Sequence, residues 1–178
     1  ETLTLTENAQ PALMATSIAA LRALEAEGIT LASHAGFVAG HSLGEYSALC
    51  AAGALSLSDT ARLLRIRGKA MQEAVPVGVG GMAAILGMDA EAVRAGCAQA
   101  AEACGEAVEA VNFNDPKQTV IAGTKAAVEK ACEVLKAAGA KRALSLPVSA
   151  PFHSSLMKPA AERLMQQLAA TPFAAPGI

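Results

Sequence analysis

The stretch GHSLGEY, residues 40–46, places one serine between two glycines. The apolar run GFVA at residues 36–39 precedes it and is typical of a β-strand, whereas residues 43–52 have the composition of a helix. A glycine–x–serine–x–glycine sequence between a strand and a helix indicates a sharp turn, in which side chains at both glycine positions would collide with neighbouring backbone. The stretch therefore predicts an α/β fold in which a strand ends at Ser42.

Ser42 lies just before the predicted helix, whose first N–H groups have no acceptor within the helix. The N–H of Leu43 is the nearest of these groups, and such donors stabilise negative charge that develops on a carbonyl oxygen. Ser42 is therefore a candidate nucleophile that would carry an acyl group. The alternative is a glycine-rich turn with an incidental serine, because so short a pattern arises by chance in a chain rich in glycine and alanine.

A serine nucleophile needs a base, and the chain offers three histidines. His41 is adjacent to Ser42, so in an extended segment its side chain points away from that of the serine. His34 lies in a polar loop, where a solvated side chain is expected. His153 follows the end of a predicted strand and a proline-rich loop, where sheet-based sites collect their residues. His153 is the predicted base, with ordinary loop packing as the alternative.

Arg67 falls in the apolar stripe of a predicted helix that follows a capping sequence at residues 56–59. It comes three residues after Leu64 and four before Met71. An arginine that faces inward needs an anion, because a buried charge is costly unless it is paired. The partner is either a carboxylate of the protein or the carboxylate of a substrate, and the stripe alone leaves both open.

The glycine-rich stretch VPVGVGG, residues 75–81, divides the chain into two predicted domains. Residues 1–75 and 149–178 are predicted to form a hydrolase-like α/β core, with a parallel sheet and a nucleophile elbow at Ser42. Residues 76–148 are predicted to form an inserted ferredoxin-like α+β subdomain, because strand, helix, strand, strand, helix and strand follow in that order.

The composition excludes several classes of function. Of the 178 residues, 53% are hydrophobic and 3% aromatic, and the formal net charge is −2. A nucleic-acid-binding protein would show a basic face, and a membrane protein an apolar run long enough to span the bilayer, so neither partner is expected. The four cysteines lack the spacing of a metal site, so we expect no metal and reduced thiols.

Longer stretches carry a family resemblance. GHSLGEYSALCAAGALSLSD, RIRGKAMQEAVPVGVGGMAAILGM, VNFNDPKQTVIAG and GAKRALSLPVSAPFHSSLMKPAAE, with ENAQPALM upstream, resemble the malonyl-CoA–acyl carrier protein transacylase family of bacterial fatty-acid synthesis. The resemblance covers nearly the whole chain. It implies transfer of a malonyl group from malonyl-CoA to the phosphopantetheine thiol of acyl carrier protein, with coenzyme A thioester as substrate and no further cofactor. It also implies a cytoplasmic protein, which we expect to be a monomer.

The resemblance also implies roles for individual residues. Ser42 corresponds to the family nucleophile, His153 to its base and Leu43 to an oxyanion donor. Arg67 corresponds to the arginine that binds the malonyl carboxylate. Positions that line the family's pocket fall on Gln10, Met71 and Asn112.

The chain departs from the family pattern in two ways. The family begins with a strand and a glycine–glutamine–glycine loop and continues past residue 178, so N- and C-terminal segments are expected to be missing. Asp115 and Lys117 replace the usual serine and glycine of a turn. Two other functions remain open: a patatin-like serine hydrolase, although the chain has no Asp-Gly dipeptide for such a site, and a non-catalytic fragment that only binds carrier protein or coenzyme A.

Overall fold

The computed structural model describes residues 2–148 and 150–178. The chain forms two compact units, one of residues up to Ala70 together with Glu162–Ile178, the other of Met71–Ala161. Each unit is described by itself below. The predicted domains, 1–75 with 149–178 and 76–148, stay a prediction for the whole protein.

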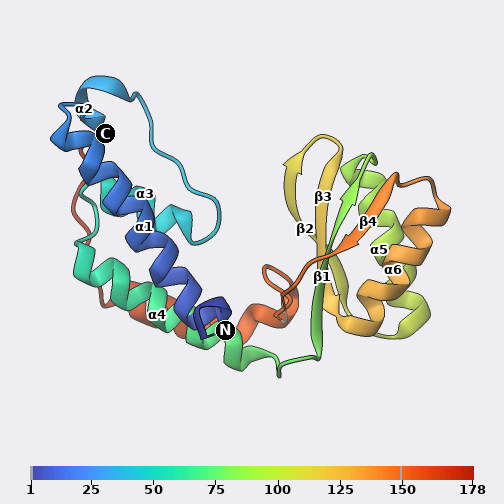
Figure 1. The fold of residues 1–178 in the computed structure, drawn as a ribbon. Helices are drawn as coiled ribbons and strands as arrows, with labels where there is room; N and C mark the ends of the chain where they lie inside the picture. The colour runs from blue at the N-terminus through green and yellow to red at the C-terminus, as the bar shows by residue number, and fades with distance from the viewer. Residues whose placement is uncertain (1, 149) are drawn as a thin grey trace. The chain divides into compact units, whose positions relative to one another are not determined.

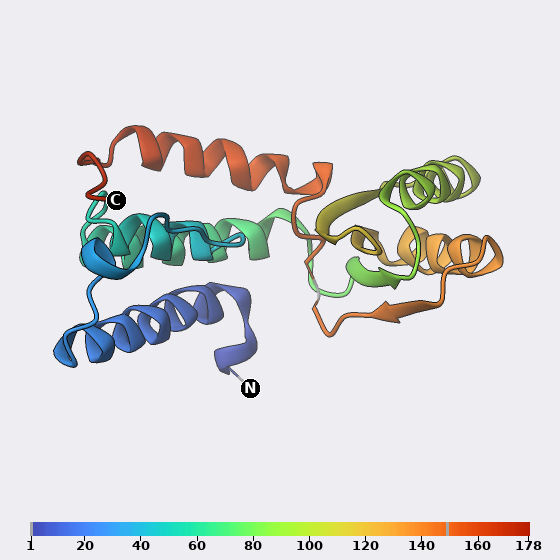
Figure 2. The same cartoon turned by 90° about the horizontal axis from the view of Figure 1, so that it is seen from above.

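The first unit is helical (Figures 1 and 2). Its elements include the 3-10 helix η1 (Thr2–Thr4), α1 (Thr6–Ala26), α2 (Leu31–His34), α3 (Gly44–Ala51), most of α4 (Leu57–Ala74) and the later part of α7 (Lys158–Ala169). Met14 and Ile18 of α1 pack with Cys50 of α3 and Leu64 of α4 in a shared core. The predicted capping sequence is present, because Ser56 Oγ accepts the Asp59 N–H at 3.0 Å before α4.

Proline is typical of the first turn of a helix, so Pro11 by itself predicts a helix start there, but helix α1 begins five residues earlier, at Thr6. Proline inside a helix removes the N–H that would bond to the carbonyl four residues earlier, here that of Glu7. Arg65 of α4 replaces this donor, because its Nη1 donates to the Glu7 carbonyl oxygen at 2.8 Å. The packing of α4 therefore stabilises an α1 start that local preference does not favour.

The two helices approach closely at Gly68. A Cβ added there would lie 2.6 Å from Glu7 Cα and 2.7 Å from the Thr6 carbonyl oxygen. Only glycine allows this approach, which brings the first turns of α1 beside the middle of α4.

The strand predicted at residues 36–39 is wrong for this structure. The segment has no strand assignment, and Phe37 is 94% exposed. A strand exists through hydrogen bonds to a neighbour, and none of the described strands belongs to the first unit. The predicted parallel sheet is therefore not seen in the part of the chain that the structure describes, where every strand pair is antiparallel.

The second unit is a four-stranded sheet with two helices on one face (Figure 1). Its elements are β1 (Gly80–Leu86), α5 (Ala90–Cys104), β2 (Val108–Asp115), β3 (Gln118–Thr124), α6 (Lys125–Ala137), β4 (Arg142–Ser145), the 3-10 helix η2 (Ser155–Met157) and the ends of α4 and α7. The strand order is β2-β3-β1-β4. The predicted sequence of strands and helices is confirmed, because alternate strand residues such as Ile85 and Ile121 bury the face that α5 and α6 cover.

Asp115 and Lys117, which differ from the usual residues of the family, lie at the turn between β2 and β3, where both form specific contacts. Asp115 Oδ1 accepts the Lys117 N–H at 2.9 Å, which closes the turn locally. Lys117 Nζ then forms an ion pair at 2.7 Å with Asp89, the residue before α5. Asp115 and Lys117 therefore connect the hairpin tip to the start of a helix.

Candidate active site

Ser42 occupies a strained turn, as the sequence predicted. Its φ is 54°, in the left-handed region that residues other than glycine rarely adopt. A Cβ added at Gly40 would lie 1.9 Å from the backbone of Gly44, so glycine is required at position 40. The corresponding expectation for Gly44 is wrong, because a Cβ there meets no atom within 4 Å. The sharp turn thus depends on Gly40 and on the conformation of Ser42.

Helix α3 starts directly after Ser42. The N–H of Gly44 bonds to the His41 carbonyl at 2.9 Å, and the N–H of Glu45 bonds to the Ser42 carbonyl at 3.2 Å. Leu43 is the residue before α3, and its N–H donates to no backbone carbonyl among the described residues. That N–H lies at the positive end of the helix, beside the serine that an acyl group would occupy.

Arg67 reaches from α4 to this serine. Its Nη2 donates to Ser42 Oγ at 3.0 Å, and its Nη1 donates to Gln10 Oε1 at 2.6 Å. The guanidinium carbon lies 5.8 Å from the centre of the Tyr46 ring, within range of a cation–π interaction. Burial lowers the pKa of Arg67, although Tyr46 and Glu45 oppose this effect. The site therefore combines a serine with a largely desolvated cation.

The partners of Arg67 bear on the choice that the sequence left open. Gln10 and Ser42 are neutral, and Arg67 forms no ion pair with a carboxylate among the described residues. The nearby Arg65, by contrast, pairs with Glu7 at 3.7 Å. Nothing in the described part of the protein therefore neutralises Arg67 by direct contact.

His153 belongs to the second unit, in the loop between β4 and η2. Its φ of 64° is also left-handed, so Ser42 and His153 are the two non-glycine residues with positive φ in the described ranges. Strained residues persist only where their surroundings hold them, and they concentrate at functional sites. The two residues that sequence reasoning chose as nucleophile and base thus share a rare backbone conformation.

Contacts on both sides hold the His153 loop. Pro151 is fully buried against Gly80, where an added Cβ would lie 2.3 Å from the proline ring. Ser154 Oγ donates to the Pro151 carbonyl at 2.7 Å. The N–H of Ser155 donates to Glu109 Oε2 of β2 at 2.9 Å. These contacts fix the backbone before and after the histidine.

The other predicted site residues are divided between the units. Gln10 lies in the first unit, whereas Met71 and Asn112 belong to the second. Met71 is buried on α4, and Asn112 is half-buried on β2 opposite Val120, beside a register shift. The structure therefore brings four predicted residues together within one unit: Gln10, Ser42, Leu43 and Arg67.

Sequence reasoning missed three residues that build this site. Tyr46 covers Arg67, Gly68 allows α1 to approach, and Thr6 holds the side chain of Gln10. A signal existed for Tyr46, because it lies in the first turn of the helix predicted directly after Ser42. Thr6 and Gly68 had no such signal, because their roles depend on how two helices pack.

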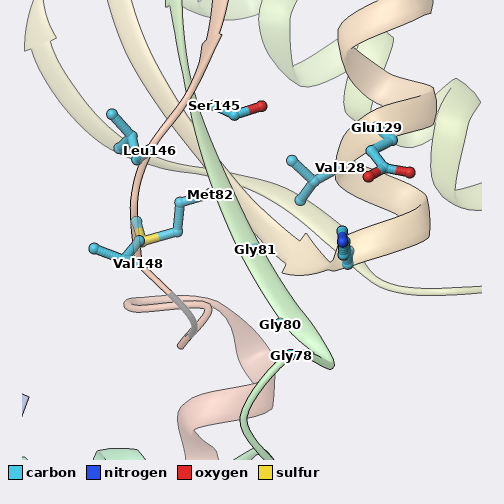
Figure 3. Close-up of a pocket in the computed structure, with 10 residues that line it drawn as sticks. Gly78, Gly80, Gly81, Met82, Val128, Glu129, Ser145, Leu146 and Val148 are labelled. Atoms are coloured by element: carbon cyan, nitrogen blue, oxygen red, sulfur yellow. The ribbon is translucent and has the colours of Figure 1, made fainter. Parts of the chain in front are cut away.

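The second unit also contains a cavity of about 230 Å³ (Figure 3). Its lining includes Met82 of β1, Leu146 and Val148 after β4, and the charged Lys125 and Glu129 of α6. None of the predicted catalytic side chains lines it. Residues 2–148 and 150–178 contain no group of metal-binding side chains, and no helix in these ranges is long and apolar enough to cross a membrane.

Comparison with known proteins identifies the family. Residues 1–178 match the acyl transferase domain family. The chain belongs to this family. The sequence-based prediction of an acyltransferase relationship is thereby confirmed.

Several relatives are highly similar. The chain is 51% identical over 178 residues to the malonyl CoA-acyl carrier protein transacylase of Salmonella typhimurium strain LT2, covering 100% of this chain and 56% of that protein. It is 57% identical over 168 residues to the Bacillus subtilis strain 168 protein of the same name, covering 94% of this chain and 51% of the relative. The chain therefore spans about half the length of the curated relatives it matches.

Solved structures agree. The acyl-carrier-protein S-malonyltransferase of Burkholderia pseudomallei 1710b superposes with a TM-score of 0.92 at 57% identity, over 99% of this chain and 56% of the other. A malonyl-transacylase in complex with its type II PKS acyl-carrier protein matches with a TM-score of 0.93 at 48% identity, over 99% and 55%. The predicted α/β fold class is therefore confirmed for this acyl transferase chain.

Proposed function

We propose that the protein transfers a malonyl group from malonyl-CoA to the phosphopantetheine thiol of acyl carrier protein, through a malonyl ester on Ser42. One observation carries the proposal: the guanidinium of Arg67 lies 3.0 Å from Ser42 Oγ, and its hydrogen-bond acceptors among the described residues are neutral. A substrate that places a carboxylate near the reacting serine fits this arrangement. The names of the relatives support the same substrates for those proteins.

The first half-reaction forms the ester. Ser42 Oγ attacks the thioester carbonyl of malonyl-CoA while His153 accepts the hydroxyl proton. The Leu43 N–H stabilises the oxyanion of the tetrahedral intermediate. The carbon–sulfur bond then breaks, and coenzyme A leaves with the proton that His153 returns.

The second half-reaction reverses these steps with another thiol. The phosphopantetheine thiol gives its proton to His153 and attacks the ester carbonyl, and Ser42 leaves with that proton. No oxidant, metal or other cofactor enters either balance. The role of His153 as base is part of the proposal, and its left-handed backbone and doubly anchored loop support it.

Arg67 recognises the malonyl carboxylate. A guanidinium can hold a carboxylate with two parallel hydrogen bonds, and partial burial strengthens the interaction. Met71 and Asn112 are proposed to line the acyl pocket, as the family resemblance implied. A hydrolase of neutral esters has no carboxylate for Arg67, so no observation favours that alternative.

The finer features of the fold are also proposals. Residues 76–148 form a ferredoxin-like subdomain, which the antiparallel order β2-β3-β1-β4 and the β1-α5-β2-β3-α6-β4 sequence support. The elbow at Ser42 supports a hydrolase-like core for the rest of the protein. The protein acts as a monomer in the cytoplasm, where its coenzyme A substrate and carrier protein would meet it.

Intact-protein mass spectrometry tests the proposed function. The full-length protein incubated with malonyl-CoA should gain one malonyl group, which a pulse of carrier protein should remove. Ser42→Ala should gain none, whereas Ser33→Ala, at an exposed serine of α2, should react normally. An adduct that persists in Ser42→Ala, or none on the wild-type protein, would contradict the proposal.

A further inference from the structure

The hydrogen bonds around Arg67 define the orientation of Gln10. A guanidinium only donates hydrogen bonds, so the Gln10 atom that lies 2.6 Å from Arg67 Nη1 must be the carbonyl oxygen. The amide nitrogen of Gln10 then points to Thr6, and it donates to Thr6 Oγ1 at 2.9 Å. Both ends of the carboxamide therefore have partners, and its orientation is fixed.

These contacts are partly buried and lie within the first unit. Gln10 is only 3% exposed, and Thr6 lies one helical turn before it on α1. The approach of the two helices at Gly68 brings Gln10 to Arg67 although 57 residues separate them in the chain. Three consecutive hydrogen bonds thus form a continuous line that ends at the proposed nucleophile: they join Thr6 to Gln10, Gln10 to Arg67, and Arg67 to Ser42.

The neutrality of this line has a physical consequence. A carboxylate in place of the Gln10 amide would pair with the guanidinium and compete with any substrate anion. A carboxamide holds the guanidinium in position and adds no negative charge beside it, so that the charge of Glu45, which is not in direct contact, is the nearby carboxylate that acts on Arg67. Tyr46 acts in the same sense, because its ring faces the cation without carrying a charge of its own.

We propose that Thr6 and Gln10 are positioning residues that form a charge-neutral clamp on Arg67 and thereby set the preference for acyl groups that end in a carboxylate. This inference rests on the proposed function for its substrate, but the charge-neutral clamp is a property of the first unit alone. Two experiments on the full-length protein test it, and the second requires no activity.

The first experiment measures selectivity as the ratio of kcat/KM for malonyl-CoA to that for acetyl-CoA. Gln10→Glu changes the charge at constant shape, so this ratio should fall at least about thirtyfold, chiefly through the KM for malonyl-CoA. Thr6→Val should lower the ratio by about three- to tenfold, and Thr6→Ser should restore it. Thr16→Val is the matched control, because the exposed Thr16 side chain donates to the Ala12 carbonyl of its own helix, and its loss should leave the ratio unchanged.

The second experiment compares urea midpoints of Gln10→Glu, Gln10→Met and the wild type between pH 3 and pH 7. Arg67 should depress the pKa of the introduced carboxyl in the folded state below its unfolded value of about 4.3. A depressed folded pKa adds stability above the unfolded pKa, and this gain disappears as the pH falls through the folded pKa. The urea midpoint of Gln10→Glu, relative to that of the wild type, should therefore rise as the pH rises from 3 to 6. The midpoint of Gln10→Met should be lower than that of the wild type at every pH.

The outcomes separate the clamp from the proposed function. If the wild type forms no malonyl ester, the proposed function fails, and a rise in the relative midpoint of Gln10→Glu with pH still supports the charge-neutral clamp. If the wild type reacts but Gln10→Glu keeps its malonyl preference, the clamp is overturned and the function stands. A relative midpoint of Gln10→Glu that falls as the pH rises would also overturn the clamp, because burial would then outweigh the attraction of Arg67.

Discussion

Gly68→Ala should disturb the site without changing any residue that touches substrate. The added Cβ would lie 2.6 Å from Glu7 Cα, whereas non-bonded carbon atoms favour about 3.5 Å. Helix α1 would have to retreat by about 1 Å, because the obstructing atoms are backbone rather than the end of a flexible side chain. The perturbation is therefore a small, directed movement of α1 away from α4.

The movement has two expected effects. It would lengthen the Arg67 Nη1–Gln10 Oε1 distance from 2.6 Å to about 3.6 Å, which is too long for a hydrogen bond. Overpacking of this kind costs about 1–3 kcal/mol, and the better helix propensity of alanine offsets up to about 1 kcal/mol of it. We expect the free energy of unfolding to fall by about 1–2 kcal/mol. The malonyl kcat/KM should fall about ten- to hundredfold, because Arg67 loses its positioning partner.

Urea unfolding and malonyl transfer in the full-length protein measure these effects. Gly36→Ala is the control, because an added Cβ at Gly36 meets no atom within 4 Å and its stability should change by less than about 0.5 kcal/mol. If Gly68→Ala keeps both the urea midpoint and the malonyl rate of the wild type, the close approach of α1 and α4 does not position Arg67, and the reasoning is refuted.

Three further predictions concern the reaction. Arg67→Ala should lower the malonyl-to-acetyl ratio of kcat/KM at least about a hundredfold, and an unchanged ratio would disprove carboxylate recognition. His153→Ala should slow acylation about 10²–10⁴-fold, whereas His34→Ala should react normally. Glu109→Ala should slow acylation several-fold by releasing the Ser155 N–H, and Glu109→Gln, which keeps an acceptor, should restore most of the rate.

Local sequence determined the elbow. The steric demand on Gly40 and the helix that follows Ser42 act over a few residues, so a short pattern was enough to predict them. The same holds for the second unit, where period-two and helical patterns predicted the order of strands and helices. The inward face of Arg67 was also readable, because a helix repeats every 3.6 residues whatever packs against it.

Two local predictions, a helix start and a strand, were wrong for a common reason. Pro11 indicated a helix start, but Arg65 supplies the donor that allows α1 to begin at Thr6. The apolar run at residues 36–39 indicated a strand, but a strand forms only where a neighbour completes its hydrogen bonds. In both cases the outcome depends on a partner that is distant in the chain.

The tertiary structure alone decided what holds Arg67. Helical periodicity predicted that the Arg67 side chain faces inward, but it did not predict whether a carboxylate, an amide or a hydroxyl would be its hydrogen-bond partner. The partner is decided by the packing of α1 on α4, which is possible because Gly68 has no side chain. This packing places Gln10 beside Arg67, although 57 residues separate them in the chain. Local sterics and periodicity act within a few residues of the chain, whereas the partners of a buried charge are set by contacts between helices, and these exist only once the chain has folded.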